Sequence, residues 1–420
     1  MRSIPPILYL WLKVLKKGKN LRQNLIEWMF QLRFFAGKGW IEVYQDTQTT
    51  LSSEKHNYIG NIKPQQKVIY FTFREFHFLD WFVPIHLALN DSFPGKYAVF
   101  YIDFGSTLRN VGNRSAYREF HLNILKRLQN SGIARSSHFS DREISYYKAF
   151  PSPDLIVTTE TIRKEAFIAR QRVYLPHYCV LKAKDTLPEK IKYNHVFLPS
   201  RPPFSYPEIE DTRIADINFH KVGYPKLNLK TTAIKLCFDH EQKLVIYAPS
   251  LDPKLILPSL KEGIFDIFKR MTDINFVIKL HPTLSSKMQN VRRLIKRQVS
   301  KTQNIIIDSQ ISIQEIGDCA SVLLTDFGSV GAEFRLRFSK RVVYLKVPKS
   351  YEGGGDLLFR DRFADEISDI DALEASLRSA LDKGDLAEKE IAEMNKQVLY
   401  QAANGDQHAA EAIDKILTES

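Results

Sequence analysis

The chain has 420 residues, of which 44% are hydrophobic and 12% aromatic, so it can bury more apolar surface than one ordinary domain, and we expect two. Its formal net charge of +12 predicts an anionic partner: nucleic acid, phospholipid head groups, a polyanionic polymer or a phosphate-bearing substrate. Cys179, Cys237 and Cys319 lie too far apart for a zinc-site or disulfide spacing, which fits a reducing, cytosolic compartment.

Residues 1–40 mix apolar and basic residues at helical spacing, as in "IPPILYLWLKVLKKGKN" from position 4. Lys13 interrupts the apolar stretch well short of the roughly 20 residues that span a bilayer, and no cleavage site of a secretory signal follows. The pattern predicts helices lying in an anionic membrane interface, with aromatic side chains inward and lysines toward the head groups. The alternative is a pair of amphipathic helices packed on the protein's own body.

Short apolar runs alternate with helical patterns over residues 41–215. The expected strands are 67–73, 97–104, 153–159 and 172–178, and residues 117–130 are an expected helix. Continuous apolar runs alternating with helices predict a parallel sheet covered on both faces. We therefore predict a first Rossmann-like domain here.

A proline-rich and charged segment near residues 200–220 marks the predicted domain boundary. A second set of strands is expected beyond it, at 244–250, 274–280, 304–309, 321–327 and 341–347, and "VGAEFRLRF" is among the expected helices. Residues 216–420 then form a second Rossmann-like domain with terminal helices. Two such α/β domains would face a cleft, and ligands gather beyond the carboxyl ends of parallel strands.

In the second domain, three predicted strands are followed at their carboxyl ends by residues suited to binding phosphate. "KLHPTL" ends a strand on Lys279 and His281, and "VIYAPS" ends one on Tyr247 and Ser250. "LLTDFGSVGAEF" carries Thr325, Asp326, Gly328, Ser329 and Glu333 from a strand into a helix. Ser329 is a good N-cap, and a helix N-terminus preceded by glycine favours a phosphate. Each stretch alone also fits an ordinary strand end or a capped turn.

In the first domain, "YLPHYCVLK" places His177 after an apolar run and Lys182 five residues later. A histidine at this position could take a proton from an attacking hydroxyl while facing His281 across the cleft.

Together these stretches, with "VGYPK" at 222–226, resemble the CDP-glycerol:poly(glycerophosphate) glycerophosphotransferases and related polyol-phosphate polymerases of teichoic acid and capsule synthesis. That family carries HGxxxK, YAPT, HP and TDYSS segments in the same order. Here Tyr178 replaces the glycine after the first histidine, Gly328 replaces a serine, and Asp252 stands about where the family often has arginine. These departures leave the donor open.

The resemblance implies a GT-B fold whose active site lies between the two domains. His177 would be the base toward the acceptor, with Lys182 on the same side. His281 would contact the donor pyrophosphate beside Lys279, supported by Thr325 and Ser329, and Glu333 would bind the ribose or the polyol. The donor is a substrate, so no cofactor is expected.

A metal could neutralise the donor's charge instead, but the DxD pair of Asp369 and Asp371 stands at a predicted helix start, where capping explains it better. We therefore expect no obligatory metal.

The leading hypothesis is a peripheral enzyme on the cytoplasmic face of the membrane that adds a polyol-phosphate unit to a lipid-linked or polymeric acceptor. A sugar transferase using a UDP- or CMP-sugar and a non-catalytic scaffold of a polymer-assembly complex are the alternatives. We do not expect a nucleic-acid partner, because no recognition module is present and the positive charge is concentrated in the amphipathic N-terminal segment.

Overall fold

The computed structural model describes most of the chain after residue 50. The described residues are 51–104, 114–144, 147, 150–159, 169–180, 193–204, 217–230, 236, 238, 242–250, 252, 254–256, 260, 262–280, 289–299, 302–308, 312–348 and 355–419. The chain divides into two compact units, Met1–Asn61 and Ile62–Ser420, and in the first of these residues 51–60 are helical. The expected membrane-associating segment, 1–40, lies outside the described residues. Within the described part, no helix is both long and apolar enough to cross a bilayer.

The second unit contains two parallel sheets. The first has the order β3-β2-β1-β4-β5-β6-β7, and all of its pairs are parallel. Its strands are β1 (Lys67–Phe73), β2 (Tyr97–Asp103), β3 (His138–Ser140), β4 (Leu155–Thr158), β5 (Gln171–Tyr174), β6 (His195–Phe197) and β7 (Asn218–His220). The central strands β1 and β2 are buried almost throughout, as continuous apolar runs predict for a sheet covered on both faces.

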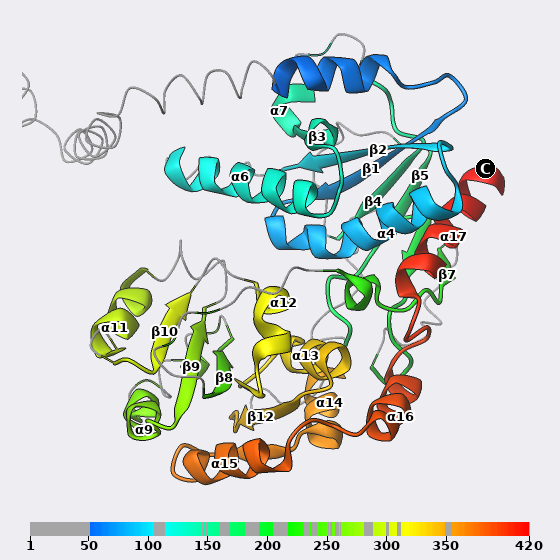
Figure 1. Cartoon of the computed structure of the whole chain (residues 1–420). Helices are drawn as coiled ribbons and strands as arrows, with labels where there is room; N and C mark the ends of the chain where they lie inside the picture. The colour runs from blue at the N-terminus through cyan, green and yellow to red at the C-terminus, as the bar shows by residue number, and fades with distance from the viewer. Residues whose placement is uncertain are drawn as a thin grey trace, which may run out of the picture. The chain divides into compact units, whose positions relative to one another are not determined.

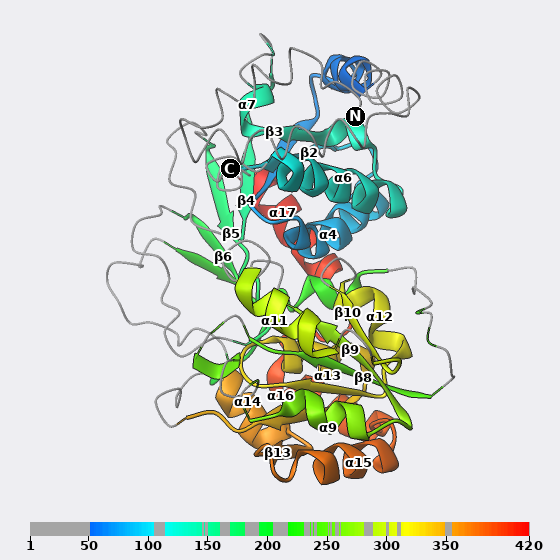
Figure 2. The ribbon, with the colours of Figure 1, turned by 90° about the vertical axis from the view of Figure 1, so that its left-hand side faces the viewer.

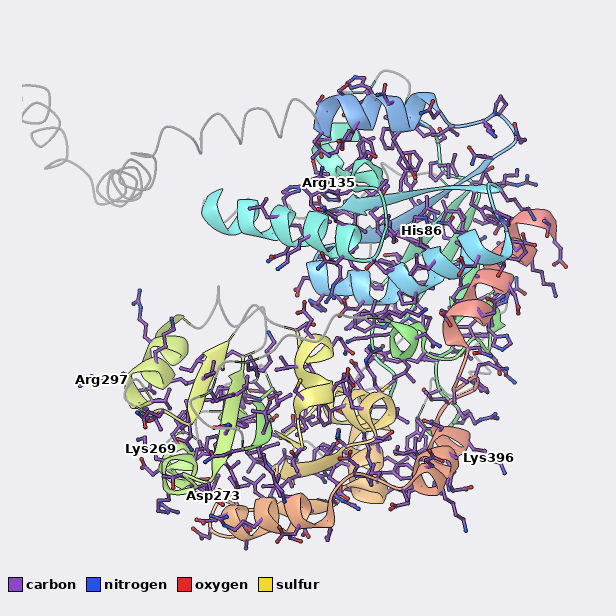
Figure 3. All side chains as sticks on the ribbon, in the orientation of Figure 1. His86, Arg135, Lys269, Asp273, Arg297 and Lys396 are labelled. Atoms are coloured by element: carbon purple, nitrogen blue, oxygen red, sulfur yellow. The ribbon has the colours of Figure 1, made fainter. Side chains whose placement is uncertain are left out.

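Helices cover one face of this first sheet, and aromatic rings pack on the other. Helices α4 (Leu79–Ser92) and α6 (Arg114–Asn130) lie side by side on the first face (Figure 1). His86 of α4 points toward the sheet, where its Nδ1 lies 3.0 Å from the Tyr101 hydroxyl (Figure 3). On the other face, Phe100 and Phe139 pack against Phe150. The short helix α7 (Asp141–Ile144) follows β3.

The second sheet has the order β10-β9-β8-β11-β12-β13 and is also entirely parallel. Its strands are β8 (Lys243–Ala248), β9 (Ile274–Lys279), β10 (Ile305–Asp308), β11 (Val322–Thr325), β12 (Arg341–Leu345) and β13 (Glu366–Ser368). The apolar side chains of α9 (Ile264–Arg270), α11 (Gln289–Val299) and α15 (Leu373–Lys383) form one core with this sheet. Those of α12 (Ile313–Ile316) and α13 (Val330–Phe338) form a second. The sheet is thus covered on both faces.

The two halves of this unit share one apolar core. Ala332 and Leu336 of α13 and Phe359 of α14 (Gly355–Phe363) belong to the same buried cluster as the first sheet. After α16 (Glu388–Val398), the last helix, α17 (Gly405–Glu419), packs against α4 (Figure 2). The first half therefore contains the C-terminal end of the chain as well as β7, which lies beyond the boundary expected at 215/216.

Candidate active site

The carboxyl ends of three central strands of the second sheet bring candidate residues to one edge. Strands β9, β8 and β11 are neighbours, and Thr325 of β11 lies opposite Ala248 of β8 in the register. Ser250, Lys279 and Asp326 therefore follow or end adjacent strands, as expected for a ligand site of a parallel sheet. Lys279 is buried, with 7% of its surface exposed.

Asp326 joins the loop after β8 to the turn after β11. Its Oδ1 accepts hydrogen bonds from the backbone N–H groups of Ser250, at 2.7 Å, and Phe327, at 2.6 Å, while its Oδ2 accepts from the Ser250 hydroxyl at 3.2 Å. Burial of this carboxyl raises its pKa to about 6 in spite of these three donors. The hydrogen bonds between Asp326 and Ser250 thus hold the two loops at this edge of the sheet together.

The turn that follows Asp326 leads directly into α13. Gly328 has φ of +110°, a conformation that side chains other than glycine rarely adopt, and a Cβ placed there would meet nothing within 4 Å. A ligand can therefore approach the backbone closely at this glycine, next to the positive end of the helix dipole. This geometry fits the expectation of a phosphate-binding turn.

Ser329 holds the N-cap position of α13 but does not cap the helix with its side chain. Its backbone is α-helical, with φ −70° and ψ −12°, and no side-chain cap hydrogen bond forms. The hydroxyl instead donates to Oε1 of Glu333 at 2.9 Å. The expectation of a capping hydroxyl was wrong, because the backbone at Ser329 is already helical rather than extended as at a typical N-cap.

Glu333 forms a buried ion pair with a lysine that the sequence did not single out. Lys226 Nζ lies 2.6 Å from Glu333 Oε2 and 4.0 Å from the ring centroid of Trp81 on α4. Lys226 and Glu333 are 9% and 8% exposed. Both carboxylate oxygens of Glu333 thus have partners within the protein, and its expected contact with a ribose or polyol hydroxyl would use a second lone pair of one of these oxygens.

Lys226 belongs to the 3₁₀ turn η5 (Pro225–Asn228) and is the last residue of the "VGYPK" segment. A second residue of α13 also binds this turn. Arg337 of α13 donates to the carbonyl oxygens of Lys226 and Leu227, each at 2.8 Å, and to that of Leu229. The Lys226–Glu333 pair and the Arg337 clamp were not foreseen, because neither has a spacing signature along the chain.

His177 lies in the loop that follows β5 and is half-buried. Its Nδ1 is 3.3 Å from the Thr159 carbonyl oxygen, which can only accept a hydrogen bond, so we assign the proton to Nδ1. Its Nε2 is then the basic nitrogen. The ring is held between Phe78, at 5.2 Å, and Tyr178, at 4.9 Å between centroids.

The His177 loop reaches the Lys226–Glu333 pair through its next residues. Burial raises the pKa of the Cys179 thiol, the Glu333 carboxylate raises it further, and Lys226 opposes the rise. Burial and Glu333 likewise raise the pKa of the Tyr224 hydroxyl. The "HYC", "GYPK" and "GSVGAE" segments, expected to act together, therefore meet around one ion pair.

Two expected ligand residues are structural instead. Tyr247 is fully buried, and its ring makes edge contacts with Phe265 and Phe268, so its hydroxyl cannot reach a phosphate or sugar without rearrangement of the core. Thr325 is also fully buried and donates its hydroxyl to the Ala248 carbonyl at 2.8 Å. In a strand covered on both faces every side chain is enclosed, so the strand end begins one residue later, at Asp326.

Of the remaining residues that the sequence singled out, the structure describes Tyr178 and Asp252. Lys182 and His281 lie outside the described part of the chain, so the meeting of two imidazoles across a cleft stays a prediction. Of the departures from the family pattern, Tyr178 is buried, whereas Oδ1 of Asp252 accepts from the Lys254 N–H at 2.8 Å and so opens a helical turn.

No protein-family model matches the chain, and no curated protein does. Solved structures match in fold. A candidate UDP-N-acetylglucosamine 2-epimerase from Listeria monocytogenes is 14% identical, with a TM-score of 0.53 over 84% of this chain and 97% of its own. The wall teichoic acid polymerase TagF is 14% identical, with a TM-score of 0.52 over 91% of this chain and 97% of its own. S. aureus MnaA, solved with UDP, is 12% identical, with a TM-score of 0.52 over 84% and 96%. The fold is GT-B-like, with two Rossmann-like domains.

Proposed function

We propose that this chain is a transferase that moves a glycerol-phosphate or related polyol-phosphate unit from a CDP-activated donor to a lipid-linked or polymeric acceptor in cell-surface polymer synthesis. The observation that carries the proposal is the convergence of the "HYC", "GYPK" and "GSVGAE" segments on the Lys226–Glu333 pair. These segments bear the resemblance to polyol-phosphate transferases. The fold likeness to TagF, which extends over nearly all of both chains, supports the same interpretation.

In the proposed reaction an acceptor hydroxyl attacks the phosphorus of the polyol phosphate, and the bond from that phosphorus to the bridging oxygen breaks. CMP leaves with the bond's electron pair, and a phosphodiester forms. The hydroxyl proton passes to Nε2 of His177. This nitrogen is the unprotonated one because Nδ1 carries the proton that is donated to the Thr159 carbonyl. Phosphoryl transfer depends largely on positioning and on neutralised charge, a task we assign to Lys279, His281 and the turn from Asp326 to Ser329.

A sugar transferase with a UDP- or CMP-sugar donor is the second candidate. It is favoured by the fold likeness to MnaA in complex with UDP, which has the same TM-score as the likeness to TagF. The two candidates differ in the product, because a polyol-phosphate transferase forms a phosphodiester whereas a sugar transferase forms a glycosidic bond. The released nucleotide also separates CDP-linked donors, which leave CMP, from UDP-sugars, which leave UDP.

We place the enzyme at the cytoplasmic face of the membrane, held there by residues 1–40. The support is the sequence pattern of that segment, in which Trp11 and Trp28 alternate with lysines and arginines. A lipid-linked acceptor would be reached from that position.

The test has a binding arm and a kinetic arm. In a thermal-shift panel of the full chain we expect CDP-glycerol or CDP-ribitol to raise the melting temperature, because a ligand that binds only the folded state stabilises it. A response to UDP-sugars with none to any cytidine compound would overturn the proposal in favour of the second candidate.

In the kinetic arm, CMP release is compared between the wild type, His177→Asn and His408→Asn. The side-chain amide introduced by His177→Asn can still donate to the Thr159 carbonyl but has no basic nitrogen, so we expect kcat to fall about 10²- to 10⁴-fold at an unchanged melting temperature. His408 lies on α17 and pairs with Glu411 there, so its variant should keep the wild-type rate. An unchanged rate in His177→Asn would remove the proposed base.

A further inference from the structure

A cluster of two histidines and one aspartate lies outside the site described above. Asp103, His121 and His138 bring one ligand atom each to within 4.8 Å of one another, and they are the one such group of three or more in the part of the chain that the structure describes. All three belong to a single β2–α6–β3 crossover: Asp103 ends β2, His121 lies on α6, and His138 begins β3.

The Nε2 atoms of both imidazoles lie near the same carboxylate oxygen. Asp103 Oδ2 is 2.8 Å from His138 Nε2 and 3.9 Å from His121 Nε2. Zinc bonds to nitrogen and oxygen of about 2.0–2.2 Å in a tetrahedron place neighbouring ligand atoms roughly 3.4 Å apart. These two distances lie on either side of that value, and the two imidazole ligand atoms lie within 4.8 Å of each other, so the three groups are close enough for one ion to draw them into coordinating positions.

Two of the three residues are buried and the third is partly exposed, as expected for a metal site with one position open to solvent. Asp103 and His138 have side-chain exposures of 0% and 1%, whereas that of His121 is 22%. A carboxylate withdrawn from water is stabilised by nearby positive charge, and a divalent cation would add such a charge to the contact that Asp103 already makes with His138. The partial exposure of His121 would give an ion, and a fourth ligand such as water or a substrate oxygen, access to the cluster.

We propose that Asp103, His121 and His138 form a zinc site with three protein ligands and one open position. The ligand set of two imidazoles and a carboxylate is of the type that zinc favours when one position is left for water. Asp103 stands at the carboxyl end of β2, so the metal lies on the ligand-binding edge of the first sheet. This departs from the sequence expectation of no obligatory metal, which rested on the search for a DxD pair beside a strand.

The alternative is a hydrogen-bonded Asp103–His138 pair to which His121 adds a longer ion-pair contact. A hydrogen bond between these two residues accounts for the 2.8 Å contact between His138 Nε2 and Asp103 Oδ2. In that arrangement His121 Nε2, 3.9 Å from the same oxygen, is too far for a hydrogen bond and forms a long ion pair, whereas a bound ion would join all three groups at once.

The test measures metal directly, without any enzymatic activity. The full chain is stripped with EDTA, dialysed against zinc chloride and analysed by plasma mass spectrometry, and zinc affinity is measured by competition with a chromophoric chelator. We expect one zinc per chain and a loss of affinity of about 100-fold or more in His121→Ala and Asp103→Asn, since even outer-shell changes lower metal affinity about 10- to 100-fold. His408→Ala, which removes a surface histidine, should bind as the wild type does.

Cobalt substitution identifies the ligands and provides the decisive control. The proposed site predicts tetrahedral cobalt absorption without thiolate charge transfer, and this signal should vanish in His121→Ala, whose partly exposed side chain can be removed with little effect on folding. Binding with a thiolate band would point to the exposed Cys319, and that result would overturn the proposal. Failure to bind stoichiometric zinc, or equal binding by wild type and His121→Ala, would overturn it as well.

Discussion

Asp326→Asn tests whether burial rather than pairing controls the charge at the strand edge. The asparagine has the same shape, and its carbonyl oxygen can keep the two N–H bonds from Ser250 and Phe327. Its amide nitrogen can donate to the Ser250 hydroxyl, which accepts as readily as it donates. The substitution therefore removes an ionisable group while leaving the hydrogen bonds in place.

The magnitude follows from the pKa of Asp326. Its folded value of about 6 exceeds the ordinary 3.8 by about 2 units, and each unit corresponds to about 1.36 kcal/mol, so ionisation in the folded state costs about 3 kcal/mol of stability. The folded protein binds more protons than the unfolded chain between about pH 4 and 6. The contribution of this group is therefore fully favourable below pH 3.8 and is lost as the pH rises through 6, with about 2 kcal/mol lost between about pH 4.5 and 7.5.

Urea unfolding of the wild type and of Asp326→Asn at several pH values between about 4.5 and 7.5 measures this difference. All other groups titrate alike in the two proteins, so the gap in unfolding free energy isolates Asp326. We expect the variant to gain on the wild type by about 2 kcal/mol over this range. Two parallel pH curves would refute the raised pKa, and a wild type that gains as the pH rises would show that its ionised carboxylate is stabilising.

Three further predictions concern other residues. Lys226→Met should lower the unfolding free energy by about 3–5 kcal/mol because it leaves Glu333 buried without its counter-charge, and pairing it with Glu333→Gln should recover part of the loss in a double-mutant cycle by urea unfolding. His195 and His220 share a 2.9 Å hydrogen bond, and burial lowers the pKa of His195 to about 4. The stability of the fold should therefore fall as the pH drops from about 6.5 toward 4, as followed by circular dichroism during an acid titration. The fall should be shallower in His195→Asn. Gly328→Ala should lower stability by about 1–3 kcal/mol from its backbone angle alone, measured as a shift in urea midpoint at constant slope.

The sequence predicted the sheets well because their central strands are enclosed on both faces. The run 67–73 forms β1, and "INFVIK" forms β9, since each is apolar over enough residues to indicate burial on both sides. Strands β3, β6 and β7 have three residues each, too few for any periodicity, and none was predicted. The proline-rich segment before 217 was interpreted as a linker between domains, but β7 follows it in the first sheet.

Topology brings the carboxyl ends of parallel strands together, and Ser250 and Asp326 do meet at one edge of the second sheet, while their role in binding a ligand stays a prediction. Tyr247 was wrong because a buried strand gives no signal of which side chains reach its open end. The Lys226–Glu333 contact joins positions 107 residues apart, and a single sequence contains no signal for such a pairing. The same holds for Asp103 and His138, which are brought together by the register of β2 with β3.

The turn from Asp326 to Ser329 is held from both sides, which bears directly on the proposed catalysis. Asp326 fixes its start to the loop after β8, while Lys226 and Arg337 fix α13 to the η5 turn that follows the first sheet. Electrostatic stabilisation of a transition state requires donors that do not reorganise during the reaction. A fixed helix N-terminus meets this requirement without contributing a nucleophile. Lys226 is therefore expected to act on the donor through position: its ammonium group pairs with Glu333, and its loss would lower the rate of transfer by loosening α13.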